Sequence, residues 1–425
     1  MATCSRALMM SSLCGVVALQ PKDLWSLFFT ILPKQLCLTA SFFLKKLRKG
    51  EHFHQPLMEL EVEVSTLPEL PQDVLMSIFA TLEIPDLLRA GSVCSSWHSA
   101  YTCLRNLGKN KQSQTPCLLY TSKSAGENVA CLYSLAENRA YKITLPEPPI
   151  HSRSLIGSSN GWLITADERS ELHLVNPITG EQIALPSVIT IEHLSFARAG
   201  DDKWTWLPHG TDYSDCVYMD GLLYALKSVG EIHAFDLTGS NVTMRVIIDR
   251  LKYCIYESMY IIRAPWGDLL QVWRTVDVPQ GEDEDSDVPE GEDADDDVPE
   301  GQDEDDDDPR KWRARTLKIK VYKVDVEAKE LVEINSLPYH MLFLGRNNSL
   351  CLCAEEHPKL KSNHVYFTDD LDQITTQLNN YTRDIGVWDL KNSSKKEIVS
   401  QIWSNWPCPT WITPNLMELN LAFGK

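Results

Sequence analysis

Residues 67–101, LPELPQDVLMSIFATLEIPDLLRAGSVCSSWHSAY, decide the fold of the N-terminal part of the chain. Pro71 suits the first turn of a helix, where its missing N–H costs nothing, and Asp73 stabilises the positive end of the helix dipole. Apolar residues then recur at helical spacing, while Pro85 and Gly91 interrupt the run. The pattern therefore predicts three short helices with a wide apolar face.

Such a unit of about 40 residues rarely buries enough apolar surface to be stable alone, so we expect its apolar face to be shared with another element. That element is either a second protein or the domain that follows, which the helices would then cap. The spacing does not decide between these alternatives, and it does not show which apolar side chains point outward.

The motif in this stretch consists of Leu70-Pro71, Val74-Leu75, Ile78-Phe79, Leu82, Pro85-Asp86-Leu87-Leu88, Val93-Cys94 and Trp97. It resembles an F-box, by which substrate receptors dock on the Skp-type adaptor of cullin-RING ubiquitin ligases. The resemblance implies that these residues bind the adaptor or form the core behind the interface. The residues carried over as adaptor-binding are Leu70, Pro71, Val74, Leu75, Ile78, Phe79, Leu82, Pro85, Leu87, Val93, Cys94 and Trp97.

The chain of 425 residues has a formal net charge of -19, but this charge is unevenly distributed. Residues 277–308 hold 19 Asp or Glu and no Lys or Arg. The rest of the chain therefore contains 40 of the 59 acidic residues and all 40 basic residues, and its formal charges balance. A balanced charge argues against a nucleic-acid surface built on bulk charge. The 12 cysteines form no CxxC pair, which predicts free thiols in a reducing compartment rather than a zinc or disulfide framework.

The first 50 residues contain one acid, Asp23, beside several serines and basic residues, a composition that suits an organellar transit peptide. Their apolar runs are shorter than the ~20 residues that cross a bilayer, so a membrane span is not expected. The alternatives for residues 1–66 are a disordered or partly helical extension without a targeting signal, a membrane-surface helix, or an artefact of the predicted gene start. The expected location is the nucleus, the cytoplasm or both, with organellar targeting as the alternative.

From Thr115 onward the pattern changes from helical spacing to strands with period-two alternation. Four segments repeat one design, a strand that ends in Asn or Asp, a polar turn and a second strand. They are residues 171–186, 231–247, 317–338 and 384–399. Hairpins that recur at such intervals are typical of propeller blades, and a β-sandwich is the second choice.

The F-box is followed by NGWLIT (160–165), VNPITGEQIALP (175–186), DCVYMDGLLYAL (215–226), GDLLQVWR (267–274) and HVYFTDD (364–370). Together these motifs resemble plant F-box proteins with a KIB-type β-propeller, and the resemblance covers residues 67–414. The chain departs from that family near residues 194–195, where a stretch of about one blade is absent, so that normal closure of the propeller is in question. The blade number is therefore not predicted.

The second departure is an insertion, three tandem ten-residue repeats at residues 277–306 between two predicted strands. Its low apolar content predicts disorder, and because loop-closure entropy grows slowly with length, the hairpin can tolerate it. The carboxylates do not follow the spacing of an EF-hand, so we expect no specific metal site and no cofactor.

The segment Gly157-Ser158-Ser159-Asn160-Gly161 fits the nucleophile elbow of serine hydrolases, G-x-S-x-G. A true elbow is followed by a helix, whereas residues 162–165 have the composition of a strand. The chain also lacks an H-E-x-x-H motif and a phosphate-binding loop. We therefore expect no catalytic activity.

The predicted organisation is α+β and multidomain, with a small three-helix F-box at 67–106 and an all-β propeller-like domain at 115–414. The domain is interrupted by the acidic insert at 277–308, and the termini are an extension at 1–66 and a tail at 415–425. The expected function is substrate recognition in an SCF-type ubiquitin ligase, with a Skp-type adaptor, through it a cullin, and a protein substrate as partners. The alternative is a propeller binding module outside any ligase, organellar or vestigial.

Overall fold

The computed structural model describes residues 70–416 apart from 112, 127, 170, 187–193, 197–202, 209–212, 239–240, 250–256, 278–314, 370–382, 399–402 and 405. The predictions for the N-terminal extension and the acidic insert thus lie outside the described residues. The described chain divides at Gln114 and Thr115 into two compact units, which we call the helical unit (70–114) and the β unit (115–414).

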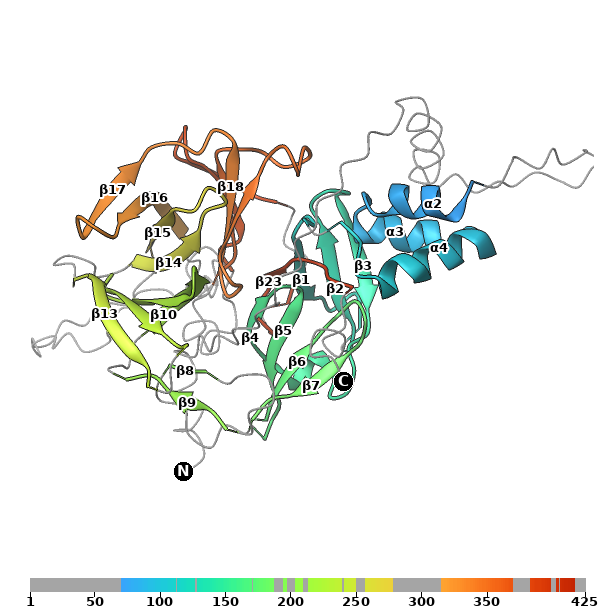
Figure 1. The fold of residues 1–425 in the computed structure, drawn as a ribbon, viewed down its shortest axis with the longest axis horizontal. Helices are drawn as coiled ribbons and strands as arrows, with labels where there is room; N and C mark the ends of the chain where they lie inside the picture. Colours follow the sequence, from blue (N-terminus) through green and yellow to red (C-terminus); the bar gives the residue numbers. More distant parts are fainter. Residues whose placement is uncertain are drawn as a thin grey trace, which may run out of the picture. The chain divides into compact units, whose positions relative to one another are not determined.

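The helical unit contains three helices, α2 (Gln72–Phe79), α3 (Ile84–Gly91) and α4 (Ser95–Asn106), which confirms the prediction (Figure 1). Pro71 precedes α2, and its carbonyl oxygen accepts hydrogen bonds from the amides of Val74 and Leu75 at 3.1 and 3.0 Å. Pro85 lies in the first turn of α3, where a proline needs no N–H donor.

The helices pack around a small apolar core of nearly inaccessible side chains: Leu75, Phe79, Ile84, Leu87, Ala90, Ala100 and Leu104. Gly91 allows α3 to approach α4, because a Cβ atom at this position would lie 2.8 Å from Cγ of Tyr101. The Phe79 and Trp97 rings meet edge to face with centroids 5.3 Å apart, which joins α2 to α4.

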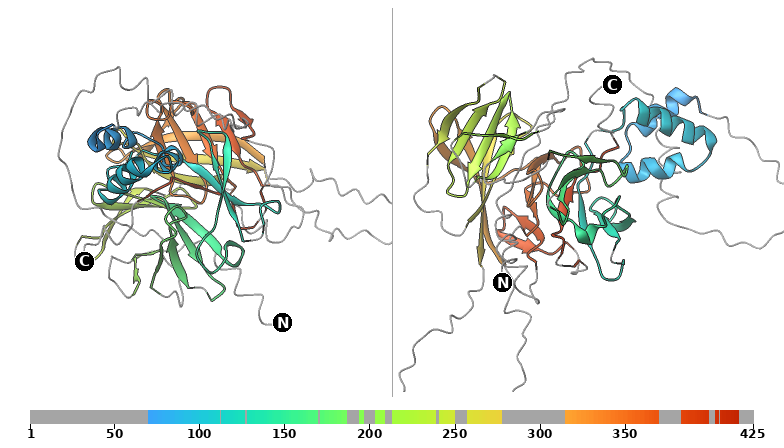
Figure 2. Two further views of the ribbon diagram at one scale, coloured as in Figure 1. Left: turned by 90° about the vertical axis from the view of Figure 1, so that its right-hand side faces the viewer. Right: turned by 90° about the horizontal axis from the view of Figure 1, so that it is seen from below.

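The β unit is a β-propeller of five blades (Figures 1 and 2). Blade 1 consists of β23 (Thr410–Ile412), β1 (Cys117–Thr121), β2 (Ala130–Ser134) and β3 (Arg139–Ile143), and blade 2 of β4 (Ser154–Ser159), β5 (Trp162–Ala166), β6 (Leu172–Val175) and β7 (Gln182–Ala184). Blade 3 consists of β10 (Tyr213–Met219), β11 (Leu222–Lys227), β12 (Ile232–Asp236) and β13 (Thr243–Ile248), and blade 4 of β14 (Glu257–Arg263), β15 (Leu269–Asp277), β16 (Arg315–Asp325) and β17 (Glu330–Ile334). Blade 5 consists of β19 (Leu350–Cys353), β18 (His340–Leu344), β20 (His364–Phe367), β21 (Gly386–Asp389) and β22 (Ser394–Lys396).

The repeated hairpin of the sequence is the outer pair of strands in blades 2 to 5. In each of these blades the Asn or Asp at the end of the strand before the outermost one accepts hydrogen bonds from turn amides through its side-chain oxygen: Asn176, Asp236, Asp325 and Asp389. These side chains form Asx turns, which fix the reversal of the chain. The propeller prediction is confirmed, and the β-sandwich alternative is wrong.

The first blade contains strands from both ends of the β unit, because β23 pairs with β1. Buried apolar clusters join blades 1 and 2, blades 3 and 4, blades 4 and 5, and blades 5 and 1. Blade 5 departs from the simple order, since β18 runs parallel to β20 and β19 lies at the inner edge.

A two-stranded sheet of β8 (Ser195–Phe196) and β9 (Thr205–Trp206) stands between blades 2 and 3 in the chain. Phe196 and Leu207 pack into one buried cluster with blade 3, and Nε1 of Trp204 donates a hydrogen bond to the carbonyl oxygen of Pro186 at 2.8 Å. This small sheet begins at residue 195, near which the sequence predicted a departure from the family, and the other described strands form five blades.

Candidate functional site

The helical unit divides the predicted adaptor-binding residues into three groups according to their exposure. Leu75, Phe79 and Leu87 are buried in the core of the unit. The partly buried residues are Leu70, Val74, Ile78, Leu82, Pro85 and Trp97, and the exposed ones are Pro71, Val93 and Cys94. The first group can therefore support an interface, whereas the other two can contribute surface to it.

Two large apolar side chains remain accessible at the end of α3, Leu88 with 43% and Val93 with 47% of its surface exposed. Leu88 belongs to the F-box pattern but was not among the residues predicted to bind the adaptor. Spacing could not distinguish it from its neighbour Leu87, since only the packing of α3 on α4 shows that Leu87 points inward. Two exposed apolar side chains within six residues of the chain are a surface that a partner can bury.

Ion pairs on the same unit hold the ends of α3 in place. Nη2 of Arg89 lies 2.7 Å from Oδ1 of Asp86, one turn earlier, and Nζ of Lys111 lies 2.8 Å from Oε1 of Glu83. The side-chain oxygen of Gln114 accepts a hydrogen bond from the amide of Ile84 at 2.7 Å. These contacts fix the start of α3 and the segment after α4. The backbone that carries Leu88 and Val93 is therefore held in place within the helical unit.

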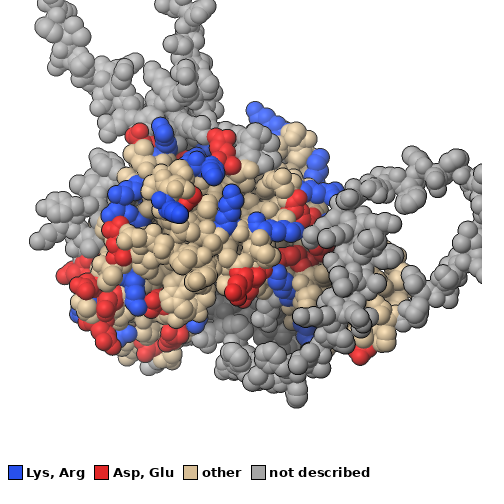
Figure 3. Space-filling model, turned by 90° about the horizontal axis from the view of Figure 1, so that it is seen from above, with Lys and Arg blue, Asp and Glu red and all other residues tan. Residues whose placement is uncertain are grey.

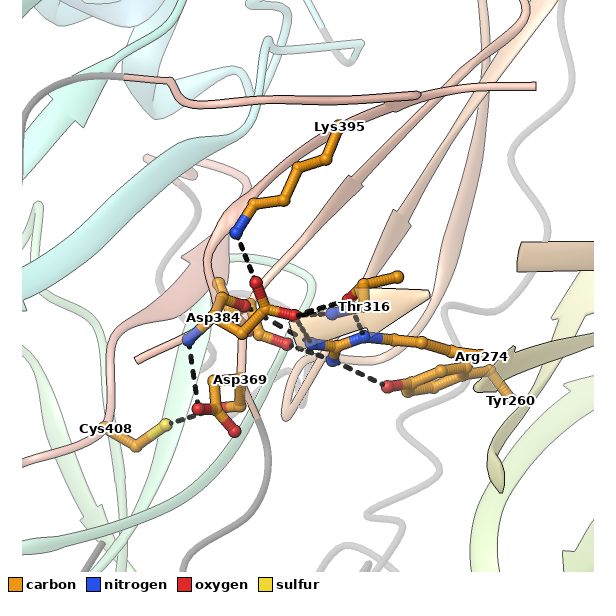
Figure 4. A network of polar contacts seen from close by, with 8 residues as sticks. Tyr260, Arg274, Thr316, Asp369, Asp384, Lys395 and Cys408 are labelled. Carbon is orange, nitrogen blue, oxygen red and sulfur yellow. Dashed lines mark hydrogen bonds and ion pairs between the residues drawn. The ribbon is translucent and has the colours of Figure 1, made fainter. Parts of the chain in front are cut away.

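A buried polar network joins blades 4 and 5 of the β unit around Arg274 and Asp384, both fully inaccessible (Figure 4). Nη2 of Arg274 lies 3.0 Å from Oδ2 of Asp384, and its Nε donates to Oγ1 of Thr316 at 2.9 Å. Nη1 of Arg274 donates to the carbonyl oxygen of Thr368 at 2.9 Å, and the guanidinium carbon lies 4.5 Å from the centroid of the Phe367 ring.

The carboxylate of Asp384 is compensated on both oxygens. Oδ2 also accepts from the amide of Thr316 at 2.6 Å, and Oδ1 is paired with Nζ of Lys395. Burial by itself raises the pKa of Asp384, but the charges of Arg274 and Lys395 outweigh burial and hold that pKa below its usual value. The network is thus a structural tie between two blades. It lies at the base of the acidic insert, since Thr316 is the second residue of β16.

A second cluster, in blade 3, has the composition of a proton relay. The hydroxyl of Tyr213 is hydrogen-bonded to Nδ1 of His233 at 2.6 Å, and Nε2 of His233 lies 2.6 Å from Oε1 of Glu231. Burial raises the pKa of Glu231, but its hydrogen bonds to His233 and Lys227 outweigh burial and lower it overall. Tyr213 is only 4% exposed, whereas the Glu231 side chain at the other end of these contacts is 18% exposed, so the cluster meets solvent only through Glu231.

The segment with the G-x-S-x-G pattern forms a β-hairpin and not a strand-to-helix elbow. β4 ends at Ser159, Asn160 and Gly161 make a tight turn with φ of 50° and 84°, and β5 begins at Trp162. The hydroxyl of Ser158 donates to the carbonyl oxygen of Trp411. Neither serine is placed as an elbow nucleophile.

Among the residues that the structure describes, no group of three or more His, Cys, Asp or Glu side chains could hold a metal ion. Within the same part of the chain, no helix is both long and apolar enough to cross a membrane. Lys and Arg are interspersed with Asp and Glu on the face shown in Figure 3, in agreement with the balanced charge outside the acidic insert.

Comparison with known protein families matches both the helical unit and the β unit. The model of the KIB1-4 beta-propeller family matches residues 132–193 and 189–389, and the F-box-like model matches residues 67–103. The two segments that match the propeller model overlap at residues 189–193, between blades 2 and 3 in the chain.

Three relatives come from Arabidopsis thaliana. F-box/kelch-repeat protein At1g57790 is 33% identical over 225 residues, which cover 50% of this chain and 59% of the relative. F-box/kelch-repeat protein At3g18720 is 24% identical, with 40% of this chain and 53% of the relative covered, and F-box protein KIB3 is 28% identical, with 30% and 28% covered. The chain thus spans little more than half the length of the first two relatives.

Proposed function

Because the chain belongs to the KIB1-4 β-propeller family and carries an F-box-like domain, we propose that it is the substrate-recognition subunit of an SCF-type ubiquitin ligase. In this role the helical unit docks on a Skp-type adaptor, and through it on a cullin, while the β unit binds the protein to be ubiquitinated. The chain itself supplies no catalytic residue and needs no cofactor, since ubiquitin transfer takes place on other subunits.

The observation that carries this proposal is the pair of exposed apolar side chains at the end of α3, Leu88 and Val93, on a helical unit whose core is already complete. A fully buried Leu or Val contributes about 1.5–3 kcal/mol relative to the exposed side chain. Since close to half of each side chain is still accessible, completing its burial against a partner would add roughly 1 kcal/mol per residue. Both together then account for about a 30-fold change in affinity.

The test is capture of a purified Skp-type adaptor by the full chain, with the dissociation constant measured for wild type and for the double variant Leu88→Ala, Val93→Ala. We expect binding by wild type and a loss of about 30-fold in the variant, because the truncated side chains no longer fill the interface. Leu107→Ala is the matched control, since Leu107 is 53% exposed on the same unit but lies at the other end of α4.

Equal binding by wild type and the double variant would contradict the assignment of this surface. Failure of the wild-type chain to bind the adaptor would contradict the ligase function, and the second reading, a propeller module outside any ligase, would take its place. The replacement of Leu70 and Pro71 together by alanine is a second variant at the entry of α2, where Pro71 starts the helix.

We further propose that the protein acts in the nucleus or the cytoplasm, where the other ligase subunits would be available, and that it recognises protein and not nucleic acid. A fluorescent fusion of the full chain tests the location. Accumulation in an organelle, abolished when residues 1–66 are removed, would instead support a transit peptide.

A further inference from the structure

A rigid aromatic surface lies at the junction of blades 4 and 5, where the turn between β14 and β15 meets the start of β18 (Figure 1). It consists of the paired rings of Trp266 and His340 together with exposed Tyr339, the residue before His340 in the chain, and we call it the aromatic surface. Trp266 is 44% and Tyr339 is 69% exposed, and an exposed proline precedes each of them in the chain. The Trp266 and His340 rings lie with centroids 4.5 Å apart, so two loops from different blades form one surface.

Both loops are held by hydrogen bonds and do not need to be ordered by a ligand. Nε1 of Trp266 donates to Oδ2 of Asp268 at 2.8 Å, and the other oxygen of Asp268 lies 3.0 Å from Nζ of Lys323. The carbonyl oxygen of Tyr339 accepts from the amide of Ala354 at 2.8 Å. A pre-ordered aromatic surface costs little conformational entropy on binding, which is a property of interface hot spots.

The chemistry of the aromatic surface selects the kind of ligand. The indole N–H of Trp266 is already used by Asp268, so the ring offers its apolar face. Burial lowers the pKa of His340, so its imidazole is uncharged at neutral pH and adds a further flat ring. The exposed hydroxyl of Tyr339 can donate to a carbonyl oxygen of the ligand.

Aromatic rings that alternate with prolines, with one hydroxyl donor among them, fit an extended polypeptide in the polyproline II conformation. The prolines of such a segment pack on the rings, and its unpaired carbonyl oxygens accept hydrogen bonds. Two exposed acids, Glu355 and Glu356, directly follow Ala354, whose amide is bonded to Tyr339. Their charge favours a segment that carries a basic side chain beside its prolines.

We propose that the aromatic surface binds an extended, proline-containing segment with a flanking basic residue in the substrate protein. This inference rests on the proposed function only where it calls the bound protein a substrate. Peptide binding by the chain does not require the adaptor, so the two proposals are tested separately.

The experiment titrates the purified full chain, without adaptor, into a fluorescein-labelled peptide of ten prolines flanked by arginines. Saturable binding is expected, with at least a tenfold loss (about 1.4 kcal/mol) in Trp266→Ala and in Tyr339→Ala, since aromatic side chains at the centre of an interface carry much of its binding energy. Tyr339→Phe keeps the ring and should lose only the contribution of the hydroxyl. Trp206→Ala, which removes another exposed tryptophan (55%), is the matched control and should bind as wild type does.

Two further peptides separate the possible ligands. Replacing the prolines by alanine should abolish binding, and replacing the arginines by glutamate should weaken it severalfold, as should Glu355→Gln combined with Glu356→Gln against the original peptide. Circular dichroism establishes that each variant is folded. The proposal is overturned if the wild-type chain shows no saturable binding, if the alanine peptide binds equally well, or if Trp206→Ala loses as much as Trp266→Ala. The variant Leu88→Ala, Val93→Ala should retain full peptide binding while losing the adaptor.

Discussion

Replacing Asp384 by asparagine should strongly destabilise the β unit. The substitution preserves the shape of the side chain but removes the negative charge that compensates Arg274 and Lys395 (Figure 4). Arg274 is completely buried and would keep its charge, because guanidinium remains protonated in proteins. Removing one partner of a buried ion pair typically costs about 3–5 kcal/mol.

The matched control is Glu333→Gln, which breaks an ion pair of the same length at the surface. Nζ of Lys320 lies 3.0 Å from Oε2 of Glu333, as Nη2 of Arg274 does from Oδ2 of Asp384, but the two surface side chains are 31% and 44% exposed. Exposed pairs of this kind contribute about 0–1 kcal/mol. The difference between the two variants therefore compares a buried network around one carboxylate with a single exposed ion pair of the same length.

Thermal unfolding followed by circular dichroism at pH 7 is the assay. A change of 3–5 kcal/mol corresponds to a fall in Tm on the order of 10 °C for a domain of this size, while the control should change Tm by about 2 °C or less. If Asp384→Asn and Glu333→Gln lower Tm equally, the network is not the tie between blades 4 and 5 that its contacts indicate.

The same pair of proteins gives a pH dependence with a definite sign. The pKa of Asp384 is lower in the folded protein than in the unfolded chain, where an Asp has a pKa of about 3.9. Its stabilisation is therefore fully present above about pH 4 and is lost as the pH falls through the lower, folded value. The Tm difference between wild type and Asp384→Asn should be constant from pH 5 to 7 and should shrink at lower pH.

Two further predictions concern the β unit. Deleting the acidic insert, residues 277–308, should leave Tm within about 2 °C of wild type and adaptor capture unchanged, because a hydrophilic insert adds little burial and only a slowly growing closure cost. A fall of several degrees would show that the insert packs on the propeller. Gly345→Ala should lower the free energy of unfolding by roughly 2 kcal/mol or more, because φ at Gly345 is +139° and the new Cβ would lie 2.0 Å from Oγ1 of Thr368. Gly180→Ala is the control, with φ of +73° and nothing within 4 Å of the new Cβ, and should cost about 1 kcal/mol. Equal losses for the two variants in chemical denaturation would contradict the steric cause.

Local patterns in the sequence were sufficient for most elements. Pro71, Pro85 and Gly91 delimit the helices because their backbone preferences act within one turn. The Asn or Asp that ends the first strand of each outer hairpin is likewise a local signal, since its side chain accepts hydrogen bonds from amides two or three residues ahead. Strand existence, the repeat and the position of the insert could therefore be predicted.

The tertiary structure decided features that depend on partners distant in the sequence. Leu87 and Leu88 are adjacent and chemically alike, and only the packing of α3 on α4 buries one and exposes the other. The parallel pairing of β18 with β20 and the return of β23 to blade 1 join segments whose alternation would equally suit other partners.

The same holds for the sites. Arg274 and Asp384 are 110 residues apart, and nothing near either residue indicates that the other compensates its charge. Trp266 and His340 become one surface only because neighbouring blades place their loops side by side. Backbone preference and turn chemistry act over a few residues and can be read from the chain, whereas burial, charge compensation and shared surfaces depend on which segments the folded core brings together.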